Sequence, residues 1–313
     1  MEVPIGAFVY ATSTAESPDR NQILCCRLRN LTECVTVVVV KIGPTGLVEV
    51  CAYDTPDGVY DCCWSELNDS ILISACADGT IKVWNIIAPP QTNPLRSFQE
   101  HGKEVSSVQW NVDRQDVFLS ASWDGTIKLW NMESPTALAT FAQHSYVVYN
   151  AVWNPRSGNV FASASGDRTV RVWDSREPVP RLTIEAHAGE VLAVDWCKYN
   201  DCLLATGSVD KLIRTWDVRA PQRPITELRG HRYAVRRVLF SPHAENILAS
   251  CGYDMTVRLW DVSAPEDALV RAWDHHTEFS VGVDFSNHQK GLLASTGWDE
   301  LLFVWNEDQD PRA

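Results

Sequence analysis

Short runs of β-forming residues recur along the whole chain and are separated by turn-forming pairs. Val105–Trp110, Thr126–Trp130 and Leu301–Trp305 are such runs, and Asp78-Gly79 and Asp124-Gly125 are such turns. Apolar runs of this length are typical of strands, and Asp-Gly is typical of a tight turn between two of them. No segment of any length has the 3.6-residue period of a helix. The pattern therefore predicts an all-β protein.

These runs belong to an internal repeat whose marker residues stand at nearly constant spacing. Tryptophan recurs at intervals of 46, 43, 43, 44 and 45 residues, at Trp84, Trp130, Trp173, Trp216, Trp260 and Trp305. An aspartate precedes each tryptophan by six residues, at Asp78, Asp124, Asp167, Asp210, Asp254 and Asp299. A hydroxyl residue precedes each aspartate by four residues, at Ser74, Ser120, Ser163, Thr206, Ser250 and Ser295. In five units a histidine precedes the aspartate by 23 residues, a spacing that selects His276 over His275, at His101, His144, His187, His231 and His276.

A period near 43 residues with these markers resembles the WD-repeat family, whose unit is a four-stranded blade of a β-propeller. We expect a single seven-bladed WD-repeat propeller, with approximate blades at 1–54, 55–100, 101–143, 144–186, 187–230, 231–275 and 276–313. The first blade is expected to have lost its markers and to hold strands near Phe8–Thr12, Ile23–Leu28, Val35–Val40 and Leu47–Ala52. Only eight residues follow Trp305, so the outer strand of the last blade is expected from around Val3 to Val9, or is missing.

The repeated hydroxyl, histidine and aspartate invite comparison with a Ser-His-Asp nucleophile system. Five or six copies of one triad cannot all be active sites, and a nucleophile must stand in a cleft rather than inside a sheet. The WD-repeat resemblance instead implies a buried tetrad in each blade that joins His, Ser or Thr, Asp and Trp, with each hydrogen bond worth about 1 kcal/mol. No phosphate-binding loop, metal-ligand spacing or nucleophile elbow appears elsewhere. We therefore predict a binding module with no catalytic residue, metal or cofactor.

The charge balance narrows the kind of partner. Forty acidic residues against 27 basic ones give a formal net charge of −13. Nucleic acid and anionic membranes attract basic patches, so we expect no nucleic-acid binding and no membrane insertion, and we expect a basic partner. The longest strongly apolar run, Val35–Val40, is far shorter than the ~20 residues that span a bilayer, and Met1–Tyr10 lacks the basic residue of a signal peptide. We expect a cytosolic protein whose ten cysteines, with no Cys-x-x-Cys pair, are reduced.

The repeat also predicts a binding face, because in WD-repeat proteins three positions of each blade commonly surround the central channel. These positions are the residue before the aspartate and the residues three and five beyond the histidine. They carry six large aromatic side chains, namely Tyr60, Trp123, Tyr149, Tyr253, Phe279 and Trp298. They also carry Glu104 and Glu190, with Glu278 beside them. A ring of aromatic residues with glutamates is typical of a protein-binding surface, although any one ring could simply plug the channel.

A narrower resemblance extends from about Val59 to Trp305. It is carried by Asp195–Asn200, His231–Pro242 (HRYAVRRVLFSP), Leu248–Asp254 (LASCGYD), Asp274–Ser286 (DHHTEFSVGVDFS) and Trp298–Glu300. These stretches resemble the family of receptors for the type 2 peroxisomal targeting signal. The resemblance implies a cytosolic shuttle that binds an N-terminal Arg-Leu-x5-His-Leu signal of cargo proteins. It also implies an import co-receptor, the long form of the type 1 signal receptor or an equivalent, and docking proteins at the peroxisome or a specialised relative of it.

The family's signal suits the predicted face. At ~100° per residue, its positions 1, 2, 8 and 9 lie on one side of a helix, which presents leucines beside cationic groups. We expect glutamates to pair with the basic residues and aromatic rings to contact the leucines. The predicted cargo-peptide site is Tyr60, Glu104, Trp123, Tyr149, Glu190, Tyr253 and Trp298. Arg236, Glu278 and Phe279 are predicted contacts of co-receptor or cargo, although an intramolecular pair with a neighbouring Glu or Asp is equally expected for Arg236.

Two other function classes are weaker alternatives. Trp173-Asp174-Ser175-Arg176 and Trp216-Asp217-Val218-Arg219 have the Trp-Asp-x-Arg form found in substrate receptors of cullin-type ubiquitin ligases. The signal has low specificity, because Asp and Arg after the blade tryptophan are common throughout WD-repeat proteins. An enzyme is the third class, and the sequence offers no activated nucleophile or metal cluster for it.

Overall fold

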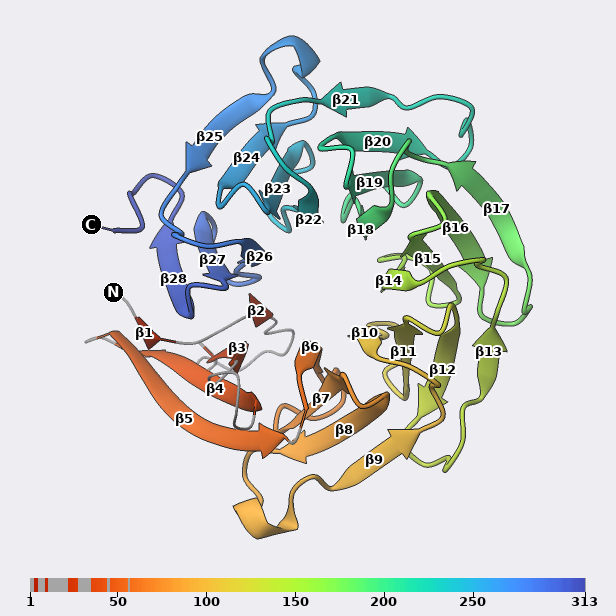
Figure 1. Cartoon of the computed structure of the whole chain (residues 1–313), viewed down its shortest axis with the longest axis vertical. Helices are drawn as coiled ribbons and strands as arrows, with labels where there is room; N and C mark the ends of the chain where they lie inside the picture. Colours follow the sequence, from red (N-terminus) through yellow and green to blue (C-terminus); the bar gives the residue numbers. More distant parts are fainter. Residues whose placement is uncertain are drawn as a thin grey trace.

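The structure, a computed structural model, describes residues 3–4, 9–10, 22–27, 35–43, 46–55 and 57–312. Its strands form seven antiparallel four-stranded sheets, arranged as a ring (Figure 1). The sheet nearest the N-terminus contains β2 (Val9–Tyr10), β3 (Gln22–Arg27), β4 (Val35–Gly43) and β5 (Gly46–Thr55). The second sheet contains β6 (Val59–Trp64), β7 (Ile71–Cys76), β8 (Thr80–Asn85) and β9 (Arg96–Gln99). The third contains β10 (Val105–Trp110), β11 (Val117–Ser122), β12 (Ile127–Asn131) and β13 (Ala139–Phe141). The fourth contains β14 (Val148–Trp153), β15 (Val160–Ser165), β16 (Thr169–Asp174) and β17 (Pro180–Glu185).

The remaining three sheets complete the ring. They contain β18 (Val191–Trp196), β19 (Leu203–Ser208), β20 (Ile213–Asp217) and β21 (Thr226–Leu228); β22 (Val235–Phe240), β23 (Ile247–Gly252), β24 (Val257–Asp261) and β25 (Leu269–Trp273); β26 (Ser280–Phe285), β27 (Leu292–Gly297), β28 (Leu301–Asn306) and β1 (Val3–Pro4). Two 3-10 turns, η1 (Pro90–Thr92) and η2 (Pro265–Asp267), lie in connections before the outer strands β9 and β25.

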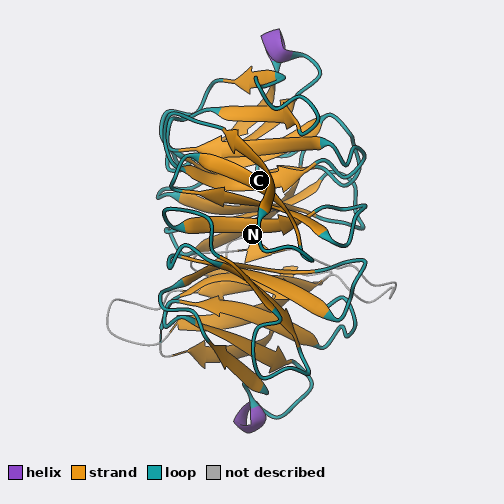
Figure 2. Ribbon diagram, turned by 90° about the vertical axis from the view of Figure 1, so that its right-hand side faces the viewer, coloured by secondary structure: helices purple, strands orange, loops and turns teal. Residues whose placement is uncertain are grey.

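The antiparallel order gives the disc two loop faces (Figure 2). One face carries the turn between the second and third strand of each WD sheet, which contains the repeat aspartate, and the loop that enters the first strand, which contains the histidine. We call this the Asp-turn face. The opposite face carries the connections that leave the first and third strands. A residue's place in the repeat therefore determines the face on which it lies.

The hydrophobic core lies between neighbouring sheets. One cluster joins Phe141 of β13 to Phe161 of β15 and Trp173 of β16, all at most 1% exposed. Burying such large side chains stabilises the fold by roughly 1.5–3 kcal/mol each, and a sheet between two others must be apolar on both of its faces. This accounts for strands such as β11, in which every residue is buried.

Polar side chains of the first strands also join neighbouring sheets. The Val108 amide donates to Asp61 Oδ2 at 3.0 Å, and the Phe240 amide donates to Asp195 Oδ2 at 2.8 Å. Asp61 and Asp195 are at most 2% exposed, so these bonds satisfy backbone groups that water does not reach. The inner ring is thus connected by hydrogen bonds from one sheet to the next.

The ring closes through β1, which pairs antiparallel with β28 in the register Val3↔Leu302 and Pro4↔Leu301. Of the two outcomes expected for the outer edge of the last sheet, the structure has the one in which the N-terminal segment supplies the strand. Both ends of the described chain therefore belong to one sheet (Figure 1).

The prediction of seven WD blades is wrong: there are six. The six sheets from β6–β9 to β26–β28 each carry the hydroxyl, aspartate and tryptophan markers. The sheet β2–β5 is built differently, since β3 (QILCCR) contains no hydroxyl residue and β4 (VTVVVVKIG) contains no tryptophan. Its described core is the valine run Val37–Val40, at most 2% exposed. Among the described residues of this sheet, apolar packing takes the place of a WD tetrad. The loss of markers was expected from the sequence, but a blade count from chain length still included this sheet as a seventh WD blade.

Candidate protein-binding face

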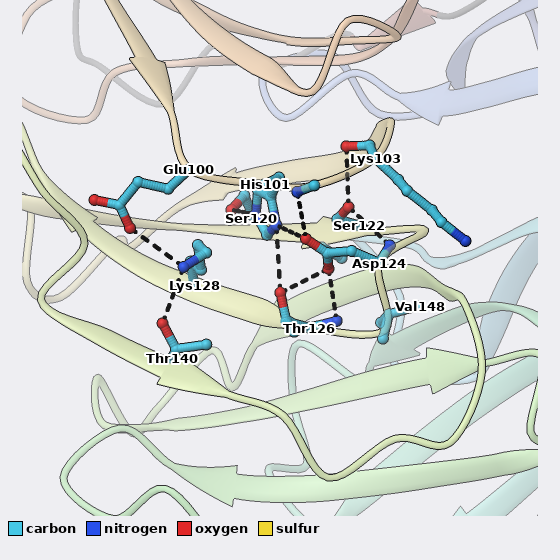
Figure 3. A network of polar contacts seen from close by, with 12 residues as sticks. Glu100, His101, Lys103, Ser120, Ser122, Asp124, Thr126, Lys128, Thr140 and Val148 are labelled. Atoms are coloured by element: carbon cyan, nitrogen blue, oxygen red, sulfur yellow. Dashed lines mark hydrogen bonds and ion pairs between the residues drawn. The ribbon is translucent and has the colours of Figure 1, made fainter.

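In the five WD sheets that have a repeat histidine, a buried polar network fixes the Asp turn, as Figure 3 shows for the sheet β10–β13. His101 Nδ1 lies 2.8 Å from Asp124 Oδ2, and His101 Nε2 lies 2.7 Å from Ser120 Oγ. The Trp130 indole Nε1 donates to the same Ser120 Oγ at 2.8 Å. A neutral ring with its proton on Nδ1 satisfies every partner, because the carboxylate only accepts and the serine hydroxyl then donates to Nε2.

The same connections recur in the next three sheets. Histidine Nδ1 lies 2.7 to 3.0 Å from the aspartate, and histidine Nε2 lies 2.7 Å from the hydroxyl, at His144–Asp167–Ser163, His187–Asp210–Thr206 and His231–Asp254–Ser250. The indole of the same sheet donates to that hydroxyl at 2.8 to 3.0 Å, from Trp173, Trp216 and Trp260. Burial opposes ionisation of Asp210, but the hydrogen bonds that it accepts, from His187 above all, lower the pKa of that carboxyl. The aspartate is therefore a charged structural anchor.

The tetrad expected at His276, Ser295, Asp299 and Trp305 is incomplete. His276 bonds Asp299 at 2.8 Å and Ser295 at 2.9 Å, but the buried Trp305 Nε1 has no hydrogen-bond partner among the described residues. The neighbouring His275 takes its place, with Nε2 2.8 Å from Ser295 Oγ. The His275 ring is wedged between Phe303 and Trp305, at centroid distances of 4.6 and 4.9 Å. A second histidine thus displaces the indole from the serine.

The anchored turns bring two of the three predicted positions together. The residue before the aspartate donates its amide to the carbonyl of the residue three beyond the histidine. The distance is 2.9 Å from Trp123 to Glu104, and 2.9 Å from Trp298 to Phe279. These side chains therefore start from adjacent backbone on the Asp-turn face.

Five of the six predicted aromatic residues form two groups rather than one continuous ring. Tyr60 of β6 faces Trp123 at a centroid distance of 5.5 Å. On other sheets, Phe279 lies 4.9 Å from Tyr253 and 5.1 Å from Trp298, whose side chain is 51% exposed. Both groups present aromatic surface at the inner edge of the Asp-turn face.

The predicted glutamates differ in their surroundings. The Tyr149 hydroxyl donates to Glu190 Oε2 at 2.6 Å, and burial, followed by this bond, raises the pKa of Tyr149. Glu104 is half-buried and Glu278 is exposed, and neither side chain has a hydrogen bond or ion pair to a described residue. The face therefore holds one glutamate fixed by a tyrosine and two that are open to a cationic partner.

The adjacent residues Arg236 and Arg237 of β22 face the channel. Arg237 Nη1 lies 4.0 Å from Asp61 Oδ1, so Arg237 forms an ion pair within the protein. Burial raises the pKa of Asp61 to about 6, although the charges of Arg237 and Arg236 oppose that rise. Arg236 is the second residue of β22. Burial, followed by the charge of Glu104, raises the pKa of Tyr60, and the charge of Arg236 opposes that rise.

A cavity of about 240 Å³ occupies the channel below this face. Its lining includes Tyr149, Arg236, Asp195 and Asp284 from four first strands. Within the described chain, no helix is long and apolar enough to cross a membrane. The described residues contain no group of three or more His, Cys, Asp or Glu side chains placed to hold a metal ion.

Sequence reasoning missed side chains on the outer rim of the same face. Tyr146 and Tyr233, each two residues beyond a repeat histidine, are 57% and 61% exposed. Arg168 and Lys211, each directly after a repeat aspartate, are also exposed. The signal for them was the same repeat register, read two positions beyond the histidine and one beyond the aspartate.

The six repeating sheets, four of which contain a complete tetrad, and a loop face bearing aromatic groups define the chain as a WD-repeat propeller protein. The family model for the WD domain, G-beta repeat, matches residues 49–85, 92–131, 135–174, 178–217 and 222–261, which together are more than half of the chain.

The chain also belongs to the family of peroxisomal targeting signal 2 receptors. Peroxisome biogenesis protein 7 of Arabidopsis thaliana is 57% identical over 279 residues, which cover 89% of this chain and 88% of that protein. The peroxisomal targeting signal 2 receptor of Dictyostelium discoideum is 58% identical over 233 residues, 74% of each chain. The human protein of that name is 42% identical over 81 residues, 26% of this chain and 24% of its own. Both resemblances expected from the sequence are confirmed.

Proposed function

We propose that this protein is an import receptor that binds the type 2 peroxisomal targeting signal of cargo proteins and shuttles between the cytosol and the peroxisome. The observation that carries the proposal is the 57% identity to peroxisome biogenesis protein 7 across 89% of the chain. The relatives named as targeting signal 2 receptors support the same substrate class.

The proposed cargo site is the inner part of the Asp-turn face. The signal helix lies across the channel mouth, with its leucines against the Tyr60–Trp123 pair and the Tyr253–Phe279–Trp298 group. Its arginine and histidine lie near Glu104 and Glu190. Desolvated aromatic contacts supply most of the affinity, and the glutamates fix the direction of the helix.

A co-receptor completes the proposed complex. A helix on this face exposes its far side to solvent, so the two-body interface falls near or below the ~1,200 Å² of stable complexes. Arg236, Glu278 and Phe279 are the proposed contacts for a segment that covers both helix and receptor. The loaded complex then binds docking proteins at the peroxisome.

Calorimetry with a synthetic Arg-Leu-x5-His-Leu peptide tests the cargo site. We expect Glu104→Lys and Glu190→Lys each to weaken binding about thirtyfold, because a hot-spot residue contributes ~2 kcal/mol. Glu133→Lys is the charge-matched control, since Glu133 is exposed and follows β12 on the opposite face. Unchanged affinity in both glutamate variants would show that the signal binds elsewhere.

The ligase-receptor alternative gains no support from its two motifs. Arg176 Nη2 pairs with Asp174 at 2.6 Å, and Arg219 Nη2 pairs with Asp217 at 2.7 Å. These pairs within the motif account for both arginines, so a local structural role is sufficient.

A further inference from the structure

The Asp turns of the six WD sheets share one backbone conformation but not one residue type. The residue after the aspartate has a positive φ in all six, between 63° and 83°. Glycine occupies it at Gly79 and Gly125, whereas side chains occupy it at Arg168, Lys211, Met255 and Glu300. A side chain in this left-handed region costs roughly 1 kcal/mol relative to glycine. Four turns thus hold a side chain on the Asp-turn face at a conformational cost.

Two of these side chains belong to a continuous rim outside the proposed cargo site. The Tyr146 ring covers Gly166, where an added Cβ would lie 2.5 Å from Tyr146 Cδ1 and 3.2 Å from Glu190 Oε2. In the next sheet an added Cβ at Gly189 would lie 3.5 Å from Val209 Cβ. Lys211 Nζ then lies 5.9 Å from the Tyr233 ring.

We call six residues on the Asp-turn face of three neighbouring sheets the outer rim: Tyr146, Arg168, Val209, Lys211, Arg232 and Tyr233. Gly166, beside Tyr146, and Gly189, beside Val209, have no side chains, and Ala188 has only a methyl group, so none of them adds a large group to this surface. Two exposed tyrosines flank it, and Val209, 44% exposed, adds apolar surface between them. Exposed apolar surface flanked by polar groups is typical of a protein interaction site.

The charge of the outer rim is opposite to that of the molecule. Arg168, Lys211 and Arg232 are exposed, and none forms an ion pair with a described residue. Three unpaired cations beside tyrosines, on a protein of net charge −13, complement an acidic partner and repel a basic one.

We propose that the outer rim binds an acidic, amphipathic segment of a protein partner other than cargo. The acidic side chains of that segment pair with Arg168, Lys211 and Arg232, and its apolar side chains contact Tyr146, Val209 and Tyr233. The basic cargo signal binds the inner, glutamate-bearing part of the face. The two ligands have opposite charge, so each is directed to its own part of one loop face.

The test uses a fluorescein-labelled 16-residue peptide of Glu, Leu and Phe, with its apolar residues at helical spacing. We expect saturable binding that added salt weakens. The double substitution Arg168→Gly/Lys211→Gly should weaken binding of this peptide at least tenfold. It should leave the fold intact, because glycine occupies this turn position in two other WD sheets. Arg156→Ala/Lys290→Ala removes two exposed cations from the opposite face and should change affinity less than twofold.

Separate outcomes distinguish this proposal from the cargo site. Glu190→Lys should not weaken the acidic peptide, and an excess of the Arg-Leu-x5-His-Leu peptide should not displace it. Displacement by the signal peptide would overturn the outer rim as a distinct site. So would an equal loss in the opposite-face control, or no saturation below ~1 mM peptide. If the acidic peptide binds and the signal peptide does not, only the proposed cargo function is refuted.

Discussion

At the scale of single residues, one histidine proton organises each complete tetrad. Because Nδ1 donates to the aspartate, Nε2 is left to accept from the hydroxyl, whose oxygen then accepts from the indole. Such a network is stable only when every member is present, since each partner left behind is buried and unpaired. The residue spacing predicts the members of the tetrad. It does not predict that His275 enters the last one, because the packing of His275 against Phe303 and Trp305 arises from the folded sheet.

We expect Asp210→Ala to lower the free energy of unfolding by about 1–3 kcal/mol, because His187 Nδ1 and the Ala188 amide both lose their acceptor. Urea denaturation measures the change. Asp267→Ala, at an exposed position in η2, is the control and should cost under ~0.5 kcal/mol. Unaltered stability in Asp210→Ala together with lost binding would contradict a structural role for the tetrad.

The buried histidines make stability fall in acid. Burial, followed by the charge of His276, lowers the pKa of His275 to about 3, and burial also lowers the pKa values of His144 and His231. Below the unfolded histidine pKa of ~6.5, the unfolded chain binds protons that the folded chain does not. The free energy of unfolding therefore decreases as the pH is lowered. A lowering of the size given for His275 reduces the free energy of unfolding by about 2 kcal/mol between pH 7.5 and 5.0. Asp61, with its raised pKa, acts in the opposite direction below pH 6.

Urea denaturation of the wild type and His275→Gln at both pH values measures this contribution. Glutamine keeps a group able to hydrogen-bond Ser295 but does not titrate. We expect its pH-dependent loss to be smaller than that of the wild type by about 2 kcal/mol. An equal loss in both proteins would mean that His275 is protonated in the folded state.

At the scale of elements, the repeat made most of the fold predictable. The strand β8 ends one residue after Trp84, and β12 ends one residue after Trp130, as the spacing requires. The sheet β2–β5 has strands close to the expected places, but its lack of markers left its kind open. The site was predictable only as a set of positions. The division of its aromatic residues into two groups depends on how side chains of neighbouring sheets pack together, and no local pattern encodes this.

The two glycine turns provide a graded test at this scale. An added Cβ would lie 3.0 Å from the carbonyl oxygens of His101 and Lys103 at Gly79, but 3.4 Å from the nearest carbonyl oxygen at Gly125. We expect Gly79→Ala and Gly125→Ala both to be destabilising, by about 1–2 kcal/mol from the positive φ, and Gly79→Ala to be the more severe. Thermal melting measures both variants. A larger loss at Gly125 would contradict the contact argument.

At the scale of the whole molecule, proposed cargo and co-receptor binding are coupled because both ligands contact one face. A coupling of ~2 kcal/mol tightens cargo binding about thirtyfold, and linkage requires the same factor for the co-receptor. Calorimetry in both orders of addition, with the long form of the type 1 signal receptor, measures it. Equal cargo affinity with and without that protein would refute the coupling.

The pairing of β1 with β28 imposes an order on folding during synthesis. Val3 is synthesised about 300 residues before its partner Leu302. At the ~5–20 residues per second of chain elongation, this strand waits roughly 15–60 s for its partner. Sheets such as β10–β13 and β14–β17 can form meanwhile from consecutive strands, whereas the last sheet cannot complete its outer edge without the N-terminal segment. The ring is therefore the last feature of the molecule to form, and an N-terminus held elsewhere during synthesis would leave the edge of β28 open.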